Sequence, residues 1–181
     1  MGRLRGLPHV HQYLVVARPC GLPVPEILLP EGNSIVPVSS SLFASLDTVR
    51  PGYVKVAERY LASGHRGLAV VANGNVLALG WYVVNLTDRR MRAEYFPLPP
   101  RSAWVHADWT APSYRRRGLQ KALFAKRILD VQSEGSALVL FGNVAADNTA
   151  SLRALSRMGF QPAGTLTLAR WVKWSWAWWR Q

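Results

Sequence analysis

Cysteine is almost missing from this sequence, which carries Cys20 alone. A single cysteine excludes an internal disulfide framework and favours a reducing, cytoplasmic setting. Long apolar runs are missing too, so no stretch has the length of a membrane-spanning helix. The basic N-terminus is interrupted by Pro8, His9 and His11 before any apolar segment begins, so we expect no signal peptide.

Acidic residues are also scarce, since 10 Asp and Glu oppose 22 Lys and Arg and leave a net charge of +12. Such an excess predicts a polyanionic partner, which is nucleic acid, an anionic membrane surface or a phosphorylated ligand. The 181 residues are 49% hydrophobic and 18% charged, a composition that excludes a disordered chain and allows one proper core. The pair His9 and His11 lacks further ligands, so we expect no metal site.

The chain divides by composition into two parts. Residues 1–40 are rich in Pro and Gly and predict an irregular N-terminal arm with one short strand at 13–17. Residues 41–181 predict a domain that alternates helices and strands. Its expected helices cover 42–49, the stretch between Pro51 and Gly64, 117–133 and 149–158, and its expected strands cover 102–110, 136–144, the two apolar runs around Asn73-Gly74 and the two runs near the C-terminus.

The central order of strand, helix and strand predicts a parallel pair joined by a crossover helix. Since the hairpin before it is antiparallel, we expect a mixed sheet flanked by helices, in the α/β (α+β) class. The loop before the crossover helix holds Arg115-Arg116-Arg117-Gly118. Cations are unfavourable at a helix N-terminus, where bare N–H groups already attract anions, so three arginines there predict a bound phosphate group.

Two segments together resemble the GNAT superfamily of acyl-CoA-dependent N-acyltransferases. In "TAPSYRRRGLQKAL", Arg115 and Gly118 match the phosphate loop of the family, and Gln120 replaces its final small residue. In "NVAADNTASLRALSRMGF", the matching residues are Asn148, Ser151, Arg157, Gly159 and Phe160. The resemblance covers residues 42–181 and is strongest over 103–160, while residues 1–40 lie outside it.

The resemblance implies a splayed pair of strands that accepts acetyl-CoA or another acyl-CoA as co-substrate, without a metal. The main chain around Trp109 and Thr110 would bind the pantetheine arm as an added strand. The remaining residues implied to bind the cofactor are Arg115, Arg116, Arg117, Gly118, Leu119 and Gln120 at the pyrophosphate, and Asn148 and Ser151 on the other side of CoA. A plain helix cap is the alternative role for Asn148.

The resemblance also sets the search for catalytic groups, because the attacking amine must lose a proton. His106 and Asp108 are two apart on one strand and are expected to share a face, and Glu94 precedes that strand. These three residues are the candidates for the base. Leu155 stands where many family members carry a tyrosine that protonates the leaving thiolate, so water or another group is needed for that step.

The C-terminal "ARWVKWSWAWWRQ" holds five of the eight tryptophans. Alternation predicts that Trp174, Trp176 and Trp178 share one face of a strand, which is expected to cover the sheet. Aromatic and basic residues together also suit a membrane or lipid surface, a longer acyl chain or a homodimer contact. Nucleic acid ranks lower, because no nucleic-acid-binding module is recognisable.

The sequence therefore predicts an acetyltransferase-type enzyme that acylates a primary amine of a small molecule or peptide. Two alternatives stay open. One is a GNAT-like module that binds acyl-CoA, membrane or nucleic acid without turnover, and the other is a fatty-acyltransferase that modifies a peptide or lipid precursor.

The triple arginine supplies a first test. We expect Arg115→Ala or Arg117→Ala to weaken acyl-CoA binding, with the larger loss at low salt, because salt screens exposed charges. Calorimetric titration of each variant and the parent at two salt concentrations measures this. Equal affinities in all three proteins would contradict the role of charge.

Overall fold

The computed structural model describes residues 9–84, 98–171 and 174–180, and every structural statement below is confined to them. Two short 3-10 helices, at Ser40–Leu42 and Pro112–Tyr114, accompany the main elements. The main elements are β1 (His9–Pro19), β2 (Ser34–Pro37), α1 (Phe43–Val49), α2 (Tyr53–Ala62), β3 (Arg66–Ala72), β4 (Asn75–Val84), β5 (Ser102–Thr110), α3 (Leu119–Glu134), β6 (Val139–Ala145), α4 (Thr149–Arg157), β7 (Gln161–Trp171) and β8 (Trp174–Arg180).

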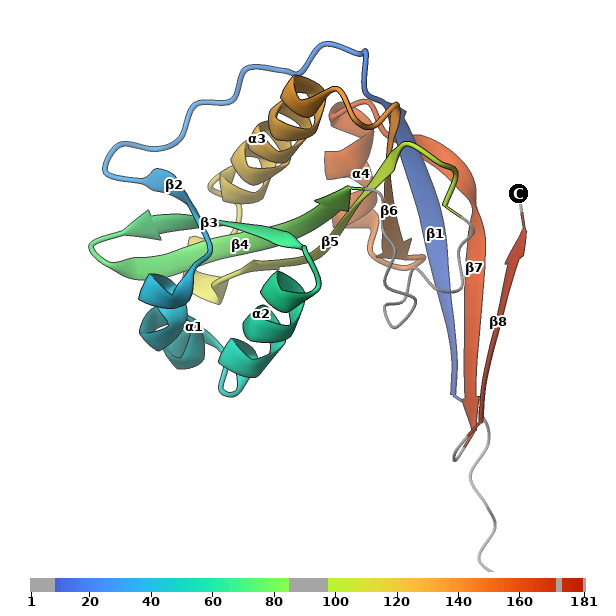
Figure 1. The fold of residues 1–181 in the computed structure, drawn as a ribbon, viewed down its shortest axis with the longest axis horizontal. Coiled ribbons are helices and arrows are strands. Elements are labelled where there is room, and N and C mark those ends of the chain that lie inside the picture. Colours follow the sequence, from blue (N-terminus) through green and yellow to red (C-terminus); the bar gives the residue numbers. More distant parts are fainter. Residues whose placement is uncertain (1–8, 85–97, 172–173, 181) are drawn as a thin grey trace, which may run out of the picture.

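The described strands form one eight-stranded sheet in the order β2-β3-β4-β5-β6-β1-β7-β8. The pair β5 and β6 is parallel, and the other neighbouring pairs are antiparallel. The predicted mixed sheet is thereby confirmed, and so is the parallel pairing across the crossover helix α3. Figure 1 shows the sheet as two halves, β2–β5 and β6-β1-β7-β8, that turn away from each other.

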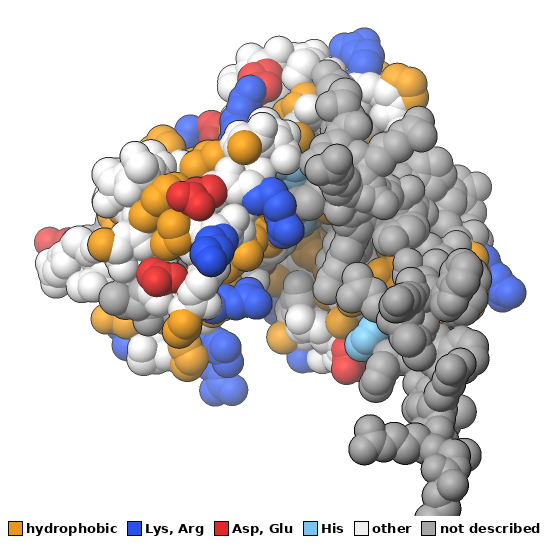
Figure 2. Space-filling model, turned by 60° about the horizontal axis from the view of Figure 1, so that its bottom comes forward, with side chains coloured by type: hydrophobic (Ala, Val, Ile, Leu, Met, Phe, Trp, Pro, Cys, Tyr) orange, Lys and Arg blue, Asp and Glu red, His pale blue; other side chains and the backbone are white. Residues whose placement is uncertain are grey.

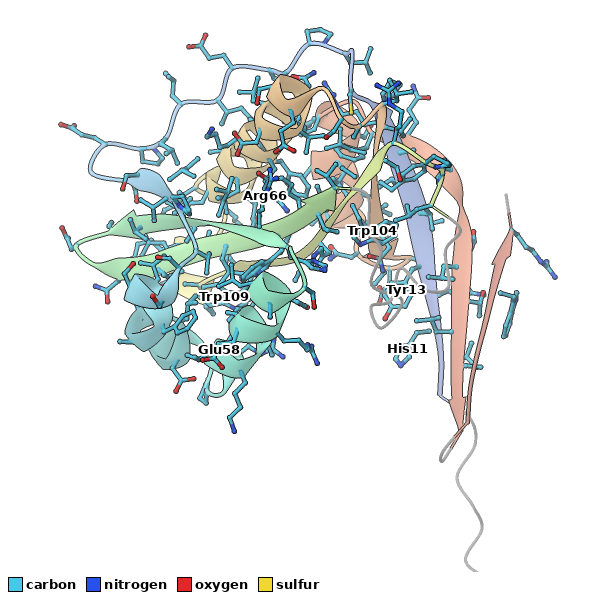
Figure 3. All side chains as sticks on the ribbon, viewed as in Figure 1. His11, Tyr13, Glu58, Arg66, Trp104 and Trp109 are labelled. Atoms are coloured by element: carbon cyan, nitrogen blue, oxygen red, sulfur yellow. The ribbon has the colours of Figure 1, made fainter. Side chains whose placement is uncertain are left out.

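Helices cover the β2–β5 half on both faces, with α1 and α2 on one side and α3 on the other (Figure 1). The α1 and α2 side is filled by a cluster that includes Leu46, Tyr53 and Trp81. The α3 side is filled by a second cluster that also takes in α4 through Leu155. A third cluster with Trp104 and Phe141, joined by the half-buried Tyr13, fills the junction between the two halves of the sheet. Figure 3 labels Trp104 and Tyr13 at this junction.

Local sequence signals explain most of these elements. The hairpin of β3 and β4 turns at Asn73 and Gly74, whose φ angles are both positive, at 48° and 75°. A two-residue turn of this kind needs positive φ at both positions, and Asn-Gly meets that need with little strain. Helix α3 ends at Gly135, which also has a positive φ of 63°.

The first strand differs most from the sequence expectation. The short strand expected at 13–17 is an 11-residue strand, β1, that lies between β6 and β7 and pairs with both. Residues 34–37, in the Pro/Gly-rich segment, add the edge strand β2. Prolines end β1 at Pro19 rather than exclude it, because every residue from Val10 to Arg18 still has an N–H to donate. None of the described helices has both the length and the apolar character needed to cross a membrane.

Arg18 anchors the end of β1. Its side chain is fully buried, and its guanidinium donates to the carbonyl oxygens of Met158 at 2.7 Å, Leu22 at 2.7 Å and Pro23 at 2.9 Å. A further bond goes to the carbonyl of Pro19 at 2.9 Å. The bound carbonyls belong to the segment after β1 and to the end of α4, so one side chain ties three parts of the chain together.

We expect Arg18→Met to lower the free energy of unfolding by about 2–4 kcal/mol. Methionine fills the space but removes the donor of the buried Met158 carbonyl and the arginine bonds to three partly buried carbonyls. Urea denaturation of the variant and the parent measures the change. Arg153→Ala, which removes an exposed arginine of α4, is the control. An Arg18→Met protein as stable as the parent would show that these carbonyls find other donors.

Candidate functional site

The two parallel strands separate at their carboxyl ends. The pairing of β5 with β6 runs from Ser102 with Val139 to Val105 with Gly142 and stops there, although both strands continue. The amide of Ala111 donates to Leu77 of β4 at 2.9 Å. Since main-chain groups alternate along a strand, the N–H and C=O of Thr110 point away from β4, to the side that β6 has left. A ligand with amide groups can therefore bind there as an added strand.

The loop after β5 reaches α3 through two unusual backbone angles. Arg116 and Gly118 have positive φ values of 63° and 80°. Gly118 is the N-cap of α3, no side chain caps the helix, and its first turn holds no acidic residue. A Cβ at Gly118 would meet nothing within 4 Å, so the space beside it is open. The N–H groups of the first turn of α3 are thus presented to a ligand at the positive end of the helix dipole.

The three arginines surround this helix end. All three are exposed. The Nε of Arg115 donates to the carbonyl of Thr110 at 3.4 Å, and the guanidinium of Arg117 lies 5.0 Å from the ring centre of Tyr114. None forms an ion pair with a carboxylate in the described part of the chain. Their charges are therefore open to solvent, and their predicted contact with a phosphate group stays a prediction.

Gln120 and Trp109 turn their side chains away from this loop. The Nε2 of Gln120 donates to the carbonyls of Leu79 at 2.9 Å and Trp109 at 2.6 Å, so the side chain bridges β4 and β5. Trp109 packs with the α1 and α2 cluster, on the α1 side of the sheet in Figure 3. Leu119 is buried in the α3 cluster. If Trp109, Leu119 and Gln120 contact the cofactor as predicted, they do so through their main-chain groups, because their side chains are engaged elsewhere.

Asn148 and Ser151 lie at the start of α4, which follows β6. The Oδ1 of Asn148 accepts from the amide of Ser151 at 3.1 Å, so Asn148 is the helix cap that the sequence offered as its alternative role. Whether either residue also contacts a cofactor stays a prediction. Leu155 is buried in the core, so its position on α4 offers no hydroxyl group to the site.

A bulge in β5 separates two of the candidate bases. The pairing with β4 shifts register between Leu79 and Trp81, and Ala107 has a positive φ of 53°. The extra residue breaks the alternation of side chains. His106 therefore faces the α2 side, whereas Asp108 faces α3. The expectation that these two side chains share one face was wrong, because it assumed an unbroken strand.

His106 belongs to an aromatic cluster under the bulge. Its Nε2 lies 2.8 Å from the Nδ1 of His65, and both imidazoles lie against the ring of Tyr60. Burial, with smaller contributions from His65 and Arg127, lowers the pKa of His106 to about 3. A group with so low a pKa takes a proton from an amine poorly. His65 was not identified from the sequence, although this residue lies between Gly64, which ends the preceding helical segment, and the first residue of β3.

Asp108 pairs with Arg127, which the sequence reasoning also missed. The Nη2 of Arg127 donates to the Oδ1 of Asp108 at 2.7 Å. Arg127 has no exposed surface, while 31% of the Asp108 side chain is exposed. Desolvation raises the pKa of Asp108 above its ordinary value, and the guanidinium opposes that rise only in part. The sequence feature that could have identified Arg127 is its spacing, because a residue four positions after Leu123 lies on the same apolar face of α3.

Two sequence predictions lie outside this description. Glu94 falls among the residues the structure leaves undescribed, and the side chains of most C-terminal tryptophans do too. Trp178 is described, and 45% of it is exposed. On the face with α1 and α2, basic side chains are interspersed with acidic and hydrophobic ones (Figure 2). The described part of that face, as Figure 2 draws it, shows no unbroken basic surface.

One comparison with known proteins identifies a family. The model of the acetyltransferase (GNAT) family matches residues 42–160. No curated protein sequence matches the chain.

Solved structures of low identity share the fold. A GNAT-family protein from Novosphingobium aromaticivorans is 23% identical, with a TM-score of 0.62 over 88% of this chain and 63% of its own. A GCN5-related N-acetyltransferase from Sphaerobacter thermophilus is 15% identical, with a TM-score of 0.62 over 88% and 51%. An aminoglycoside N-acetyltransferase in complex with CoA is 16% identical, with a TM-score of 0.56 over 71% and 91%. The chain thus spans between about half and two thirds of the first two structures.

The buried histidine gives a prediction for stability. Because folding holds the pKa of His106 near 3 and an unfolded histidine titrates near 6.5, the unfolded chain binds more protons between these values. The free energy of unfolding should therefore fall by about 2 kcal/mol between pH 7 and pH 5 on account of this residue. We expect His106→Gln to flatten the fall in urea denaturation. His11→Gln, which removes an exposed histidine, should keep the parent's slope, and a His106→Gln protein with that slope would contradict the assignment.

Proposed function

The chain belongs to the acetyltransferase (GNAT) family, and from that membership we propose that it transfers an acyl group from acyl-CoA directly to a primary amine. We propose acetyl as the transferred acyl group. The acceptor is a small molecule or a peptide. The proposal extends the family's reaction to this chain through the groups around the gap between β5 and β6.

One observation carries the proposal. Strand β5 leaves β6 after Val105, and its free edge leads into the uncapped first turn of α3. A strand-like edge next to a helix N-terminus suits a ligand with amide groups at one end and a pyrophosphate at the other. Acyl-CoA is such a ligand. The exposed Arg115, Arg116 and Arg117 add charge where its phosphates would lie.

The residues present fit this co-substrate. The main chain around Thr110 would hold the pantetheine arm, and the amides from Arg116 to Gln120 would hold the pyrophosphate. Gly118 leaves room for a close approach of the ligand, because it has no side chain and the space where a Cβ would stand is open. Its positive φ would also strain most other residues. Acyl-CoA supplies an activated thioester carbonyl, and the protein supplies orientation and a proton acceptor.

Asp108 is the base that the geometry favours. Its Oδ1 is held by Arg127, and its Oδ2 has no partner among the described residues, so one oxygen stays available to a proton. The raised pKa makes the carboxylate a better acceptor than an ordinary one. His106 suits this role less because its pKa is low, and Glu94 remains a candidate from the sequence alone.

Direct transfer is favoured over a covalent enzyme intermediate. The one thiol of the chain, Cys20, is buried, and burial raises its pKa, so it is a poor nucleophile. The amine nitrogen would attack the thioester carbonyl, the bond from carbon to sulfur would break, and the amine proton would pass to Asp108. Water would protonate the leaving thiolate, since Leu155 has no proton to give.

The acyl donor can be tested by titration. Calorimetry with CoA, acetyl-CoA and longer acyl-CoAs should show binding that is tightest with acetyl. Affinity that grows with chain length would favour the fatty-acyltransferase alternative. Binding without acylation of any amine would favour the non-catalytic module, which the absence of a tyrosine at Leu155 motivates. No binding of any acyl-CoA at saturation would overturn the proposal.

Asp108→Asn provides the catalytic prediction. We expect kcat to fall about 10²- to 10⁴-fold, the usual contribution of a general base, with the affinity for acetyl-CoA unchanged. The assay is release of free CoA thiol with a panel of amines. Asp130→Asn, on the same helix as Arg127 but paired with Lys126 at the surface, is the control. Full activity in Asp108→Asn would remove it as the base.

A further inference from the structure

Arg127 is held in place by more than its ion pair. Its Nε donates to the carbonyl of Leu123 at 3.2 Å, one turn back on α3, and its Nη1 donates to the carbonyl of Trp81 at 3.0 Å. The guanidinium also lies 4.2 Å from the ring centre of Phe124. These contacts fix the planar group against β4, so its Nη2 points in one direction only.

Gly80 reserves the space for the pair. A Cβ at this position would lie 2.5 Å from the Oδ1 of Asp108 and 2.8 Å from two atoms of the Arg127 guanidinium. Real Cβ atoms do not approach that closely, so any side chain at position 80 would displace the carboxylate or the guanidinium. Gly80 lies on β4 at the register shift, opposite the bulge at Ala107 that turns Asp108 toward α3. Glycine, bulge and buried arginine thus meet at one carboxylate.

The pair is one-sided. Arg127 binds the Oδ1 of Asp108, and the Oδ2 has no partner in the described part of the chain. A pair that served stability alone would gain from a bidentate contact and from exclusion of water. Here 31% of the Asp108 side chain stays exposed, on the part of β5 that no longer pairs with β6, while the arginine is completely enclosed. The arrangement therefore fixes the orientation of the Asp108 carboxylate without burying it.

We propose that Arg127 is a positioning residue that holds Asp108 through its Oδ1 and aims the Oδ2 at the amine that is acylated. This inference rests on the proposed function, because it assigns Arg127 a part in the reaction of Asp108. Arg127 does not touch the substrates; it acts through the direction and the ionisation of the carboxylate.

Few other groups titrate around Asp108. Tyr53 lies in the α1 and α2 cluster on the opposite face of the sheet and interacts with Asp108 only through its charge, and burial raises the pKa of Tyr53 to about 12. His106 neighbours it on β5, with a pKa near 3. Neither changes its charge between pH 5 and 9. An acidic limb in the pH dependence of kcat is therefore assigned to Asp108 only where it moves together with the titration of the Asp108 carboxyl itself.

The test compares Arg127→Lys, Arg127→Met and Gly80→Ala with the parent. Lysine keeps the buried charge but not the three fixed donors, so kcat should fall on the order of 10- to 100-fold, while KM for acetyl-CoA stays unchanged. Methionine removes the charge, so kcat should fall further and the acidic limb should move to higher pH. Gly80→Ala keeps every charge and should lower kcat by displacing the carboxylate. Arg66→Lys, which replaces an exposed arginine paired with Glu134, is the matched control.

A second readout does not depend on activity. The side-chain carboxyl of Asp108, followed by ¹³C NMR against its absence in Asp108→Asn, should titrate at higher pH in Arg127→Met than in the parent. Circular dichroism identifies variants that fail to fold, and Gly80→Ala then carries the test, because it leaves Asp108 and Arg127 in the chain.

The outcomes separate the two claims. If the parent acylates no amine, the proposed function fails; if Asp108→Asn keeps full activity, its base assignment fails. If Asp108→Asn is inactive but folded Arg127→Lys and Gly80→Ala keep the parent's kcat and acidic limb, the positioning role alone fails. A loss of kcat that follows the loss of thermal stability, with an unmoved Asp108 titration in Arg127→Met, would also overturn it.

Discussion

The parallel pairing of β5 with β6 is the contact on which the rest of the molecule depends. It lasts from Ser102 to Val105 on β5, which is enough to hold the two halves of the sheet together and short enough to let them part. Each strand is held on its other edge, β5 by β4 and β6 by β1, so each keeps one paired neighbour where the two separate. The unpaired main chain beyond Val105 is thereby exposed to a ligand without fraying.

One inserted residue decides the chemistry beside that gap. Without the bulge at Ala107, His106 and Asp108 would lie on the same face of β5, among the aromatic residues of α2. With it, the histidine stays in that cluster and is held neutral, while the carboxylate turns to a buried guanidinium. Two groups next to each other in the sequence thus have opposite electrostatic environments. Such a separation gives each group its own ionisation without any change of residue type.

The parts that could be predicted from the sequence were those governed by local rules. Asn73-Gly74 marked the hairpin, and the arginines before Gly118 marked the start of α3. The position of β1 could not be predicted, since no local pattern says which distant strands it pairs with. The bulge at Ala107 escaped because its residue is an ordinary alanine, held at positive φ by the surrounding sheet. Arg127 escaped because a buried cation is recognised only when its partner is in view.

The place of β1 in the sheet has a consequence for synthesis of the chain. About 120 residues separate Pro19 from Val139, where its first neighbour β6 begins. At about 5–20 residues per second, a ribosome needs roughly 6–24 s to make them. During that interval the segment of β1 is outside the ribosomal exit tunnel with both of its edges unpaired. Its other neighbour, β7, is made only after α4. This half of the sheet therefore assembles late, and the nascent protein depends on protection of β1 more than its finished stability would indicate.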